Sequence, residues 1–354
     1  MSTVPFSERG GKARGCLDLV TGRYPAFVFG GRLGAFLPVF HFHEVTRDEL
    51  EPKLRHLADN GYRSVVSDEI AAYVRGDLTL PQRAVGLCFD DAWKSLATVA
   101  APLLKQYGLR GITYAIPARI TEHGEGDSPF VTWGELSALH ASGVIDVQSH
   151  TDSHSRVFVS PDVEDFVQPG YGATPLLNRP QISASPSLAF VTPADLGAPL
   201  YGMRSRMSDG RRALVSTAVH AKCVELVARE GSTGFFLRPD WRKVLHAIVA
   251  SSPPVSFESE SDQARMIEHE LARSRAILND RLKTGSVAHI CLPWGISGSQ
   301  TEAMLKRTGY RSAFANRLRG QHAVHPGDDP YWLKRLPNHY ISRLPGRGRQ
   351  FWSS

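Results

Sequence analysis

Cysteine is scarce in this sequence, and its distribution argues against a disulfide scaffold. The 354 residues include four cysteines (Cys16, Cys88, Cys223 and Cys291), and no two of them form a Cys-x-x-Cys pair. Cys88 and Cys291 lie inside apolar runs, where a free cysteine behaves as a small hydrophobic residue. The pattern predicts a chain without disulfides in a reducing compartment, and we therefore expect a cytoplasmic location.

Long apolar segments and targeting signals are also missing. The first residues, MSTVPFSERGGKARG, are polar and lack the apolar segment of a secretory signal. No apolar run reaches the roughly 18 residues of a membrane span, so no transmembrane segment is expected. The charge excess of +6 is diffuse except in a basic tail at 341–354. Because no nucleic-acid-binding motif accompanies it, we expect no nucleic-acid partner.

Much of the chain alternates between strand and helix patterns. Leu50, Leu54 and Leu57 have helical spacing, and Thr132 with Glu135 forms a capping box. The stretch 26–42 reads as strand, turn and strand. Further strands are predicted at 63–67, 83–89, 110–116, 144–148, 287–292 and 311–315, and helices at 93–108, 132–143, 261–285 and 301–310. Repeated β-α units with continuously apolar strands predict an α/β fold with a parallel sheet, either a barrel or a doubly wound sheet.

The alternation stops in the middle of the chain. Residues 156–208 are rich in Pro, Ser, Gly and Asn, a helix is predicted at 211–229, and GFFLRPDW reads as strand and turn. We interpret 156–257 as an insertion, partly irregular and partly helical, into a discontinuous domain of 36–155 and 258–340. Residues 1–35 form an N-terminal extension. Long insertions of this kind usually form functional loops.

Polar side chains follow three of the predicted strands. Asp90 and Asp91 end the segment CFDD, His150 and His154 lie in SHTDSH, and CLPWG contains Pro293 and Trp294. The carboxyl ends of parallel strands share one face, where active sites form. These segments are therefore expected to meet in space.

The residue types of these segments are suited to a divalent cation. Two adjacent carboxylates repel unless a positive charge lies beside them. His150, His154 and one aspartate would form a two-histidine, one-carboxylate set that leaves positions for water and substrate. The second aspartate could then accept a proton from metal-bound water. Each pair alone is also common in solvated turns, so the joint placement at strand ends carries the prediction.

The sequence resembles the polysaccharide deacetylase family, also called the NodB-homology domain or carbohydrate esterase family 4. Cys88-Phe89-Asp90-Asp91 is similar to its T-F-D-D motif, and His150–His154 to its H-[ST]-x-x-H motif. The resemblance implies a distorted (β/α) barrel, with Asp90 as the catalytic base and Asp91, His150 and His154 as metal ligands. Zn²⁺ is the expected ion, with Co²⁺ or Ni²⁺ as alternatives.

Two further segments resemble one branch of the family. FHFHEV is similar to its opening strand and implies that His43 lies near the site mouth; CLPWG is similar to a segment that lines the acetyl or sugar pocket, which implicates Pro293 and Trp294 in substrate binding. Trp294 could equally pack in the core. Cys88 replaces the usual threonine, and the arginine that orients the base is not identified. The general acid is also unassigned, with His43, His322, His325 and His339 as candidates by chemical type.

The resemblance implies a hydrolase that removes an acetyl group, most simply an N-acetyl group, from a saccharide. Two alternatives remain open at this stage. The first is a deformylase or deacetylase that acts on a lipid-linked sugar by the same chemistry. The second is a catalytically weak relative that binds saccharide without turnover.

Overall fold

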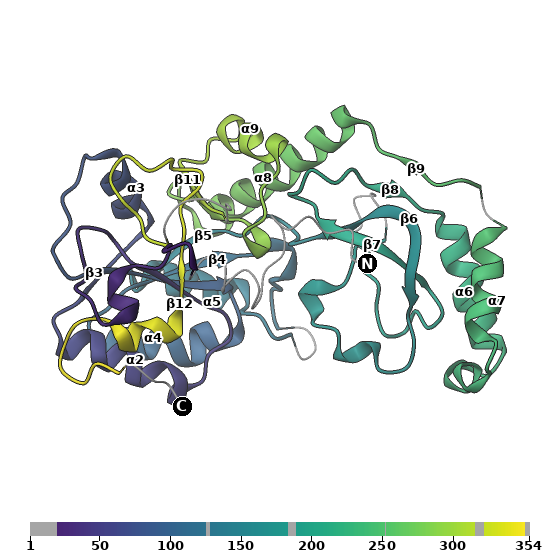
Figure 1. Ribbon diagram of the computed structural model, residues 1–354, viewed down its shortest axis with the longest axis horizontal. Helices are drawn as coiled ribbons and strands as arrows, with labels where there is room; N and C mark the ends of the chain where they lie inside the picture. Colours follow the sequence, from purple (N-terminus) through teal and green to yellow (C-terminus); the bar gives the residue numbers. More distant parts are fainter. Residues whose placement is uncertain (1–19, 125–127, 183–188, 252, 316–321, 351–354) are drawn as a thin grey trace. The chain divides into compact units, whose positions relative to one another are not determined.

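A computed structural model describes residues 20–124, 128–182, 189–251, 253–315 and 322–350 (Figure 1). Cys16, most of the expected N-terminal extension and residues 351–354 of the basic tail lie outside this part. The described chain forms two compact units. The larger comprises the residues up to Ser153, Glu268–Ser297 and those from Glu302 onwards, and the smaller comprises His154–Ile267 and Gly298–Thr301.

A parallel sheet of eight strands forms the centre of the larger unit (Figure 1). The strand order is β11-β10-β5-β4-β3-β1-β12, with β2 also paired to β3, and every pair is parallel. The strands are β1 (Val39–Phe42), β2 (Arg63–Val65), β3 (Ala84–Asp91), β4 (Gly111–Ala115), β5 (Ile145–Ser149), β10 (His289–Cys291), β11 (Ser312–Phe314) and β12 (Leu336–Pro337).

The two ends of this sheet are joined by one short segment. Leu333 forms a parallel bridge with Phe314 of β11, and three residues later Leu336 pairs with Phe40 of β1. The sheet therefore curls until its first and last strands share a seam. This confirms the predicted α/β fold and the distorted (β/α) barrel.

Helices cover the outside of the curled sheet. They are α2 (Arg47–Asp59), α3 (Ser67–Arg75), α4 (Ala101–Gln106), α5 (Trp133–Ala141), α8 (Glu260–Leu282) and α9 (Ser299–Arg307). The predicted capping box of α5 is confirmed, because Thr132 accepts from the amide of Glu135 while the Glu135 carboxylate accepts from the amide of Thr132. The predicted helix at 93–108 is divided into a π-helical turn, Leu96–Ala100, and α4.

Side-chain alternation along β1 separates two apolar cores. Phe40 and Phe42 pack outward among the helices with Leu50, Leu54 and Leu57 of α2. Val39 points into the barrel interior, which Leu37, Cys88, Ile112, Tyr114, Cys291 and Phe314 also fill. This alternation follows from the two-residue period of a strand. It also turns His41, two residues after Val39, toward the inside of the barrel.

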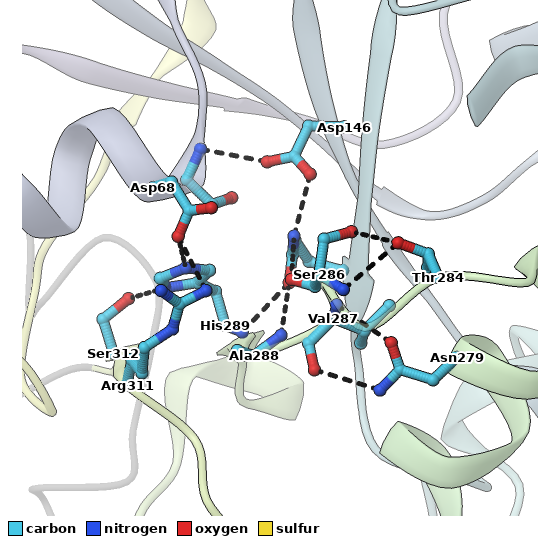
Figure 2. Close-up of polar contacts among 12 residues, drawn as sticks. Asp68, Asp146, Asn279, Thr284, Ser286, Val287, Ala288, His289, Arg311 and Ser312 are labelled. Atoms are coloured by element: carbon cyan, nitrogen blue, oxygen red, sulfur yellow. Dashed lines mark hydrogen bonds and ion pairs between the residues drawn. The ribbon is translucent and has the colours of Figure 1, made fainter. Parts of the chain in front are cut away.

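A buried histidine links the starts of β10 and β11 to α3 (Figure 2). His289 Nδ1 lies 2.7 Å from the Ser312 hydroxyl and Nε2 lies 2.9 Å from the Asp68 carboxylate, which also pairs with Arg311 at 2.8 Å. The hydrogen bond from His289 lowers the pKa of Asp68. These polar groups satisfy one another at the amino ends of β10 and β11.

The smaller unit contains a long antiparallel ribbon that the sequence did not predict. Its strands are β6 (Arg156–Phe166) and β7 (Pro199–Ser205), and β8 (Ala213–Leu214) pairs with β9 (Ser256–Phe257). A helical pair, α6 (Thr217–Arg229) and α7 (Trp241–Ala250), packs on Phe166. The sequence indicates a partly irregular, partly helical insertion without these strands; the pairing of β6 and β7 is interrupted by register shifts, which obscure the alternation.

Three local predictions also differ from the structure. The strand predicted at the start of GFFLRPDW (234–241) is instead the second half of a 3₁₀ helix, Ser232–Leu237, that follows the left-handed Gly231. The helix predicted from 211 begins at Thr217, because the Ser216 side chain caps it. The first strand predicted within 26–42 is a 3₁₀ helix, Ala26–Phe29, that ends at left-handed Gly30.

A buried ion pair joins two segments of the smaller unit that are distant in sequence. The carboxylate of Glu258 accepts from Arg206 at 2.7 and 2.8 Å and from the backbone amide of Arg212 at 2.7 Å. Burial, followed by the charge of Arg206, lowers the pKa of Arg212 to about 10. The Glu258 carboxylate thus binds the Arg206 guanidinium and the Arg212 backbone, while the Arg212 guanidinium donates to Gln181. Across the described residues, no helix combines the length and apolar character that a membrane crossing requires.

Candidate active site

The Asp90–Asp91 pair ends β3, the central strand that is buried along its whole length. Both side chains are buried at 3% exposure. β4 pairs with β3 at both aspartates, and β5 pairs with the other side of β4. His150 directly follows β5, so it lies at the same carboxyl edge of the sheet as the two aspartates. The three sequence segments that were predicted to converge therefore do share one edge of the sheet.

Unusual backbone conformations concentrate in these segments. Seven described non-glycine residues have positive φ; four of them lie in the three segments (Asp91, Thr151, His154 and Trp294), and Ala92 directly follows the first segment. The left-handed conformation costs a residue with a side chain about 1 kcal/mol or more. Such strain persists where surrounding contacts hold it, and it often marks a functional site.

Asp90 is held by an arginine from the seam of the barrel. Arg335 donates to both carboxylate oxygens, at 2.6 and 2.7 Å. Burial acts to raise the pKa of Asp90, but the charge and hydrogen bonds of Arg335 outweigh it and keep the pKa well below its usual range. Arg335 is itself nearly buried, with a pKa raised well above the ordinary value by the Asp90 charge despite burial. The Asp90 carboxylate is therefore ionised and fixed in orientation.

Asp91, His150 and His154 offer one ligand atom each within 4.8 Å of one another. His150 Nε2 lies 3.3 Å from Asp91 Oδ1. Two ligands at about 2.1 Å from a tetrahedral ion are separated by roughly 3.4 Å. The spacing of this pair therefore fits a shared divalent cation.

Neighbouring groups orient two of these side chains, so that His150 Nε2 and Asp91 Oδ1 face each other. The carbonyl of Cys291 lies 2.6 Å from His150 Nδ1 and accepts its proton in a hydrogen bond, so Nε2 is the ring nitrogen that faces Asp91. Trp93 Nε1 donates to Asp91 Oδ2 at 2.9 Å, which leaves Oδ1 on the side of His150. Burial opposes a charged imidazole, yet the bonds to Asp91 and Cys291 raise the pKa of His150 well above its usual value. The groups around His150 therefore favour a positive charge beside Asp91.

A second possible ligand group overlaps the first. Asp90, His150 and the thiol of Cys291 also lie within 4.8 Å of one another. Arg335 already occupies both oxygens of Asp90, however, and a guanidinium would compete with a cation for them. The donor set of Asp91, His150 and His154 does not compete with Arg335 and is therefore the better candidate for a metal site.

Two histidines of β1 and its end lie beside Asp90. His43 Nε2 is 3.8 Å from Asp90 Oδ2, and its side chain is 56% exposed. The His41 ring packs edge-on against His43, with ring centroids 5.8 Å apart. Burial, then the charge of Arg335, lowers the pKa of His41 to about 3. His41 is thus neutral, whereas His43 is open to solvent at the edge of the site.

The remaining candidate histidines occupy other surroundings. His322 stacks on Tyr24, with ring centroids 4.8 Å apart, and His325 lies 3.6 Å from the Asp328 carboxylate. His339 packs on Tyr340, and burial lowers its pKa. Of the four candidate histidines, His43 is the one whose imidazole lies beside the Asp90 carboxylate.

Pro293 and Trp294 follow β10 in a 3₁₀ turn, Pro293–Gly295. Pro293 is buried, and Trp294 is partly exposed with a left-handed φ of 54°. The same strand supplies the carbonyl of Cys291 to His150. The CLPWG segment therefore begins with the residue that contacts His150, one of the candidate metal ligands.

Sequence reasoning missed Arg335 and Trp93. Trp93 stands two residues after Asp91 and would have been a reasonable candidate for a side-chain contact to it. Arg335 was harder to find because it lies in WLKRLPN, outside any helical or alternating pattern. Its R-x-P spacing, Arg335-Leu336-Pro337, was the available signal, and it becomes meaningful once β12 is seen to pair with β1.

Comparisons with known proteins show that the chain is similar to polysaccharide deacetylases. The family model described as polysaccharide deacetylase matches residues 77–169, which include Asp90, Asp91, His150 and His154. The chain is 26% identical over 128 residues to YxkH of Bacillus subtilis, named as a candidate polysaccharide deacetylase. It is 27% identical over 124 residues to the poly-β-1,6-N-acetyl-D-glucosamine N-deacetylase of Escherichia coli K12.

These sequence matches are partial. They cover 34% of this chain and 44% of YxkH, and 32% of this chain and 18% of the Escherichia coli protein. The likeness of fold extends further. The BpsB deacetylase domain from Bordetella bronchiseptica superposes with a TM-score of 0.56 at 14% identity, over 87% of this chain and 97% of that domain.

Proposed function

Because the chain belongs to the polysaccharide deacetylase family, we propose that it is a metal-dependent hydrolase that removes an N-acetyl group from a saccharide. The observation that carries the proposal is the fixed, ionised Asp90 carboxylate beside the Asp91, His150 and His154 donor group. The Escherichia coli relative is named for action on poly-β-1,6-N-acetyl-D-glucosamine. An oligomer of N-acetylglucosamine is therefore the first substrate to test.

Asp91, His150 and His154 would hold the ion. A divalent cation bound there would lower the pKa of a water molecule and polarise the acetyl carbonyl. Zn²⁺ is the default for two imidazoles and one carboxylate, and Co²⁺ or Ni²⁺ would fit the same donors. Trp93 and the Cys291 carbonyl would keep the Asp91 and His150 ligand atoms in place.

Asp90 would act as the general base. Its carboxylate is ionised at neutral pH, and Arg335 prevents it from rotating toward the cation. A base with a strongly lowered pKa is intrinsically weak, so it needs a water molecule that is already acidified. The cation would supply that acidity, which explains why both groups belong to one site.

His43 would donate a proton to the leaving amine. Its imidazole lies 3.8 Å from Asp90 and is open to solvent, so it can reach a bound sugar and exchange its proton with water. Pro293 and Trp294 would border the acetyl group or the sugar ring, and the partial exposure of Trp294 makes contact with substrate possible.

The test is acetate release from a panel of substrates by the full chain. The panel contains β-1,6- and β-1,4-linked N-acetylglucosamine oligomers, an O-acetylated sugar and a formamido sugar. We expect acetate from at least one N-acetylated oligomer, loss of activity with a chelator and recovery with Zn²⁺, Co²⁺ or Ni²⁺. Stoichiometric metal without release of acetate or formate from any substrate would instead support a saccharide-binding relative.

A further inference from the structure

The larger unit contains a second cavity, of about 870 Å³, at the amino ends of its strands. Leu37, just before β1, and Ala84, the first residue of β3, both line it. Asp90 lies six residues further along β3, which corresponds to about 20 Å at 3.3 Å per residue. The cavity is therefore separate from the candidate active site and lies at the opposite end of the barrel.

The lining of this cavity combines apolar groups with one sign of charge. Its described lining includes three arginines, Arg32, Arg83 and Arg349, and no aspartate or glutamate. Phe36, Tyr73 and Leu80 supply apolar walls. A volume within the range of about 300–1,000 Å³ and a mostly apolar wall with a few polar groups are typical of small-ligand sites. The three arginines favour an anionic group on the ligand, and the apolar lining favours a hydrocarbon part.

The three arginines have different surroundings. Arg349 donates to the carbonyls of Arg343, Gly30, Phe27 and Gly31, which ties it to the frame of the cavity. Arg83 donates to the carbonyl of Asn60 and lies over the Tyr62 ring, 5.5 Å from its centroid. Arg32 is exposed and follows the glycine pair Gly30-Gly31. Arg32 can therefore turn toward a ligand with the smallest rearrangement.

Apolar side chains continue from the cavity to the surface. Phe29, next to the lining residue Gly30, is 58% exposed, and Leu78, next to Thr79, is 36% exposed. Exposed apolar side chains bordering an apolar cavity are expected where a hydrocarbon chain enters. We propose that this cavity binds a single-chain amphiphile with an anionic head group, with the chain against Phe36 and Leu80 and the head group at Arg32 and Arg83.

The proposal is tested by calorimetric titration of the full chain with decanoate, decyl phosphate, decanol and decyltrimethylammonium. Both anions should bind, with a negative heat-capacity change from apolar burial. Decanol should bind at least about tenfold more weakly, because a charge-assisted hydrogen bond contributes about 1.5–3 kcal/mol. The ratio of decanoate to decyl phosphate affinity distinguishes a carboxylate from a phosphate head group.

Two variants locate the site. Arg32→Glu should weaken both anions at least about tenfold, and Ala35→Trp, at an exposed lining position, should abolish binding by filling the cavity. Arg211→Glu, an exposed arginine of the smaller unit, is the matched control and should bind like the unaltered chain. Acetate release should be the same in all three, because the cavity is remote from Asp90.

Several outcomes would overturn the proposal. Equal affinity for decanol and decanoate would show that the arginines do not bind an anionic head group. Unchanged binding by Ala35→Trp would show that the ligand binds outside this cavity. Absence of binding by all four compounds would also reject it. Binding that appears only after deletion of residues 351–354 would assign the cavity to the chain's own Phe351-Trp352.

Discussion

Arg335 donates to both oxygens of the Asp90 carboxylate, at 2.6 and 2.7 Å, across 245 residues of chain. The pair joins the last short strand of the sheet to its central strand, so closure of the barrel and orientation of the proposed base depend on the same segment. A bidentate guanidinium fixes both the charge state and the rotation of a carboxylate, which a lysine cannot do.

Replacement of Arg335 should alter the pH dependence of the proposed reaction. In Arg335→Gln the pKa of Asp90 should rise, because burial then acts without the opposing charge. The carboxylate would be protonated at higher pH, so the acid limb of kcat/KM should move upward and turnover should fall about 10- to 100-fold. Arg110→Gln, at an exposed ion pair, is the control. An unchanged pH profile with normal metal content would contradict the orienting role.

Removal of His43 should affect substrates according to their leaving group. His43→Gln should lower turnover of an N-acetylated sugar by about 10²–10⁴-fold, which is the usual contribution of a general acid. Hydrolysis of p-nitrophenyl acetate should change little, because its leaving group departs without a proton. The measurement compares kcat for both substrates in the same variant. Equal losses on both would assign His43 to binding or to structure instead.

His41 should make the protein less stable toward acid. Its pKa is lowered from 6.5 to about 3 in the folded state, so below pH 6.5 the unfolded chain takes up a proton that the folded chain does not. The free energy of unfolding should therefore decrease as pH falls, by at most about 1.4 kcal/mol per pH unit for this residue. In His41→Leu the decrease between pH 7 and 5 should be smaller by up to about 2 kcal/mol.

Urea unfolding at the two pH values measures this difference. His246→Gln is the control, since His246 is exposed. If the unaltered chain and His41→Leu lose stability in parallel, the buried, neutral state assigned to His41 is wrong.

The Glu258 carboxylate should be the largest single polar contribution to the smaller unit. Glu258→Gln removes the charge that faces Arg206 and leaves two guanidinium groups buried beside each other. Breaking a buried ion pair in this way costs about 3–5 kcal/mol. Glu230→Gln, at an exposed pair with Arg238, should cost no more than about 1 kcal/mol. Chemical unfolding of both variants checks the contrast, and equal stabilities would contradict it.

The larger unit was predictable because each strand combines apolar sequence with clear turn residues. β3 and β4 are buried at every position, and α2 carries its leucines at helical spacing, so local pattern and final structure agree. The placement of Asp90, Asp91 and His150 at one edge then followed from strand direction alone. Continuous apolar runs identify these strands because both faces of the sheet are covered.

The missed features depend on contacts between distant segments. Arg335 directly precedes β12, a two-residue strand too short to show a period. β6 and β7 pair through register shifts, which break the alternation that identifies strands. The orienting arginine and the ribbon of the insertion were therefore not visible in any local window of sequence.

The comparison of Asp90→Asn with Asp91→Asn tests the central claim most directly. Bound metal per chain and the rate of acetate release are measured together on the two purified variants, with the unaltered chain beside them. The account predicts that Asp90→Asn keeps a full equivalent of metal and loses most turnover, whereas Asp91→Asn loses the metal itself. Equal loss of metal in both variants, or full turnover in Asp90→Asn, would contradict the division into one base and three ligands.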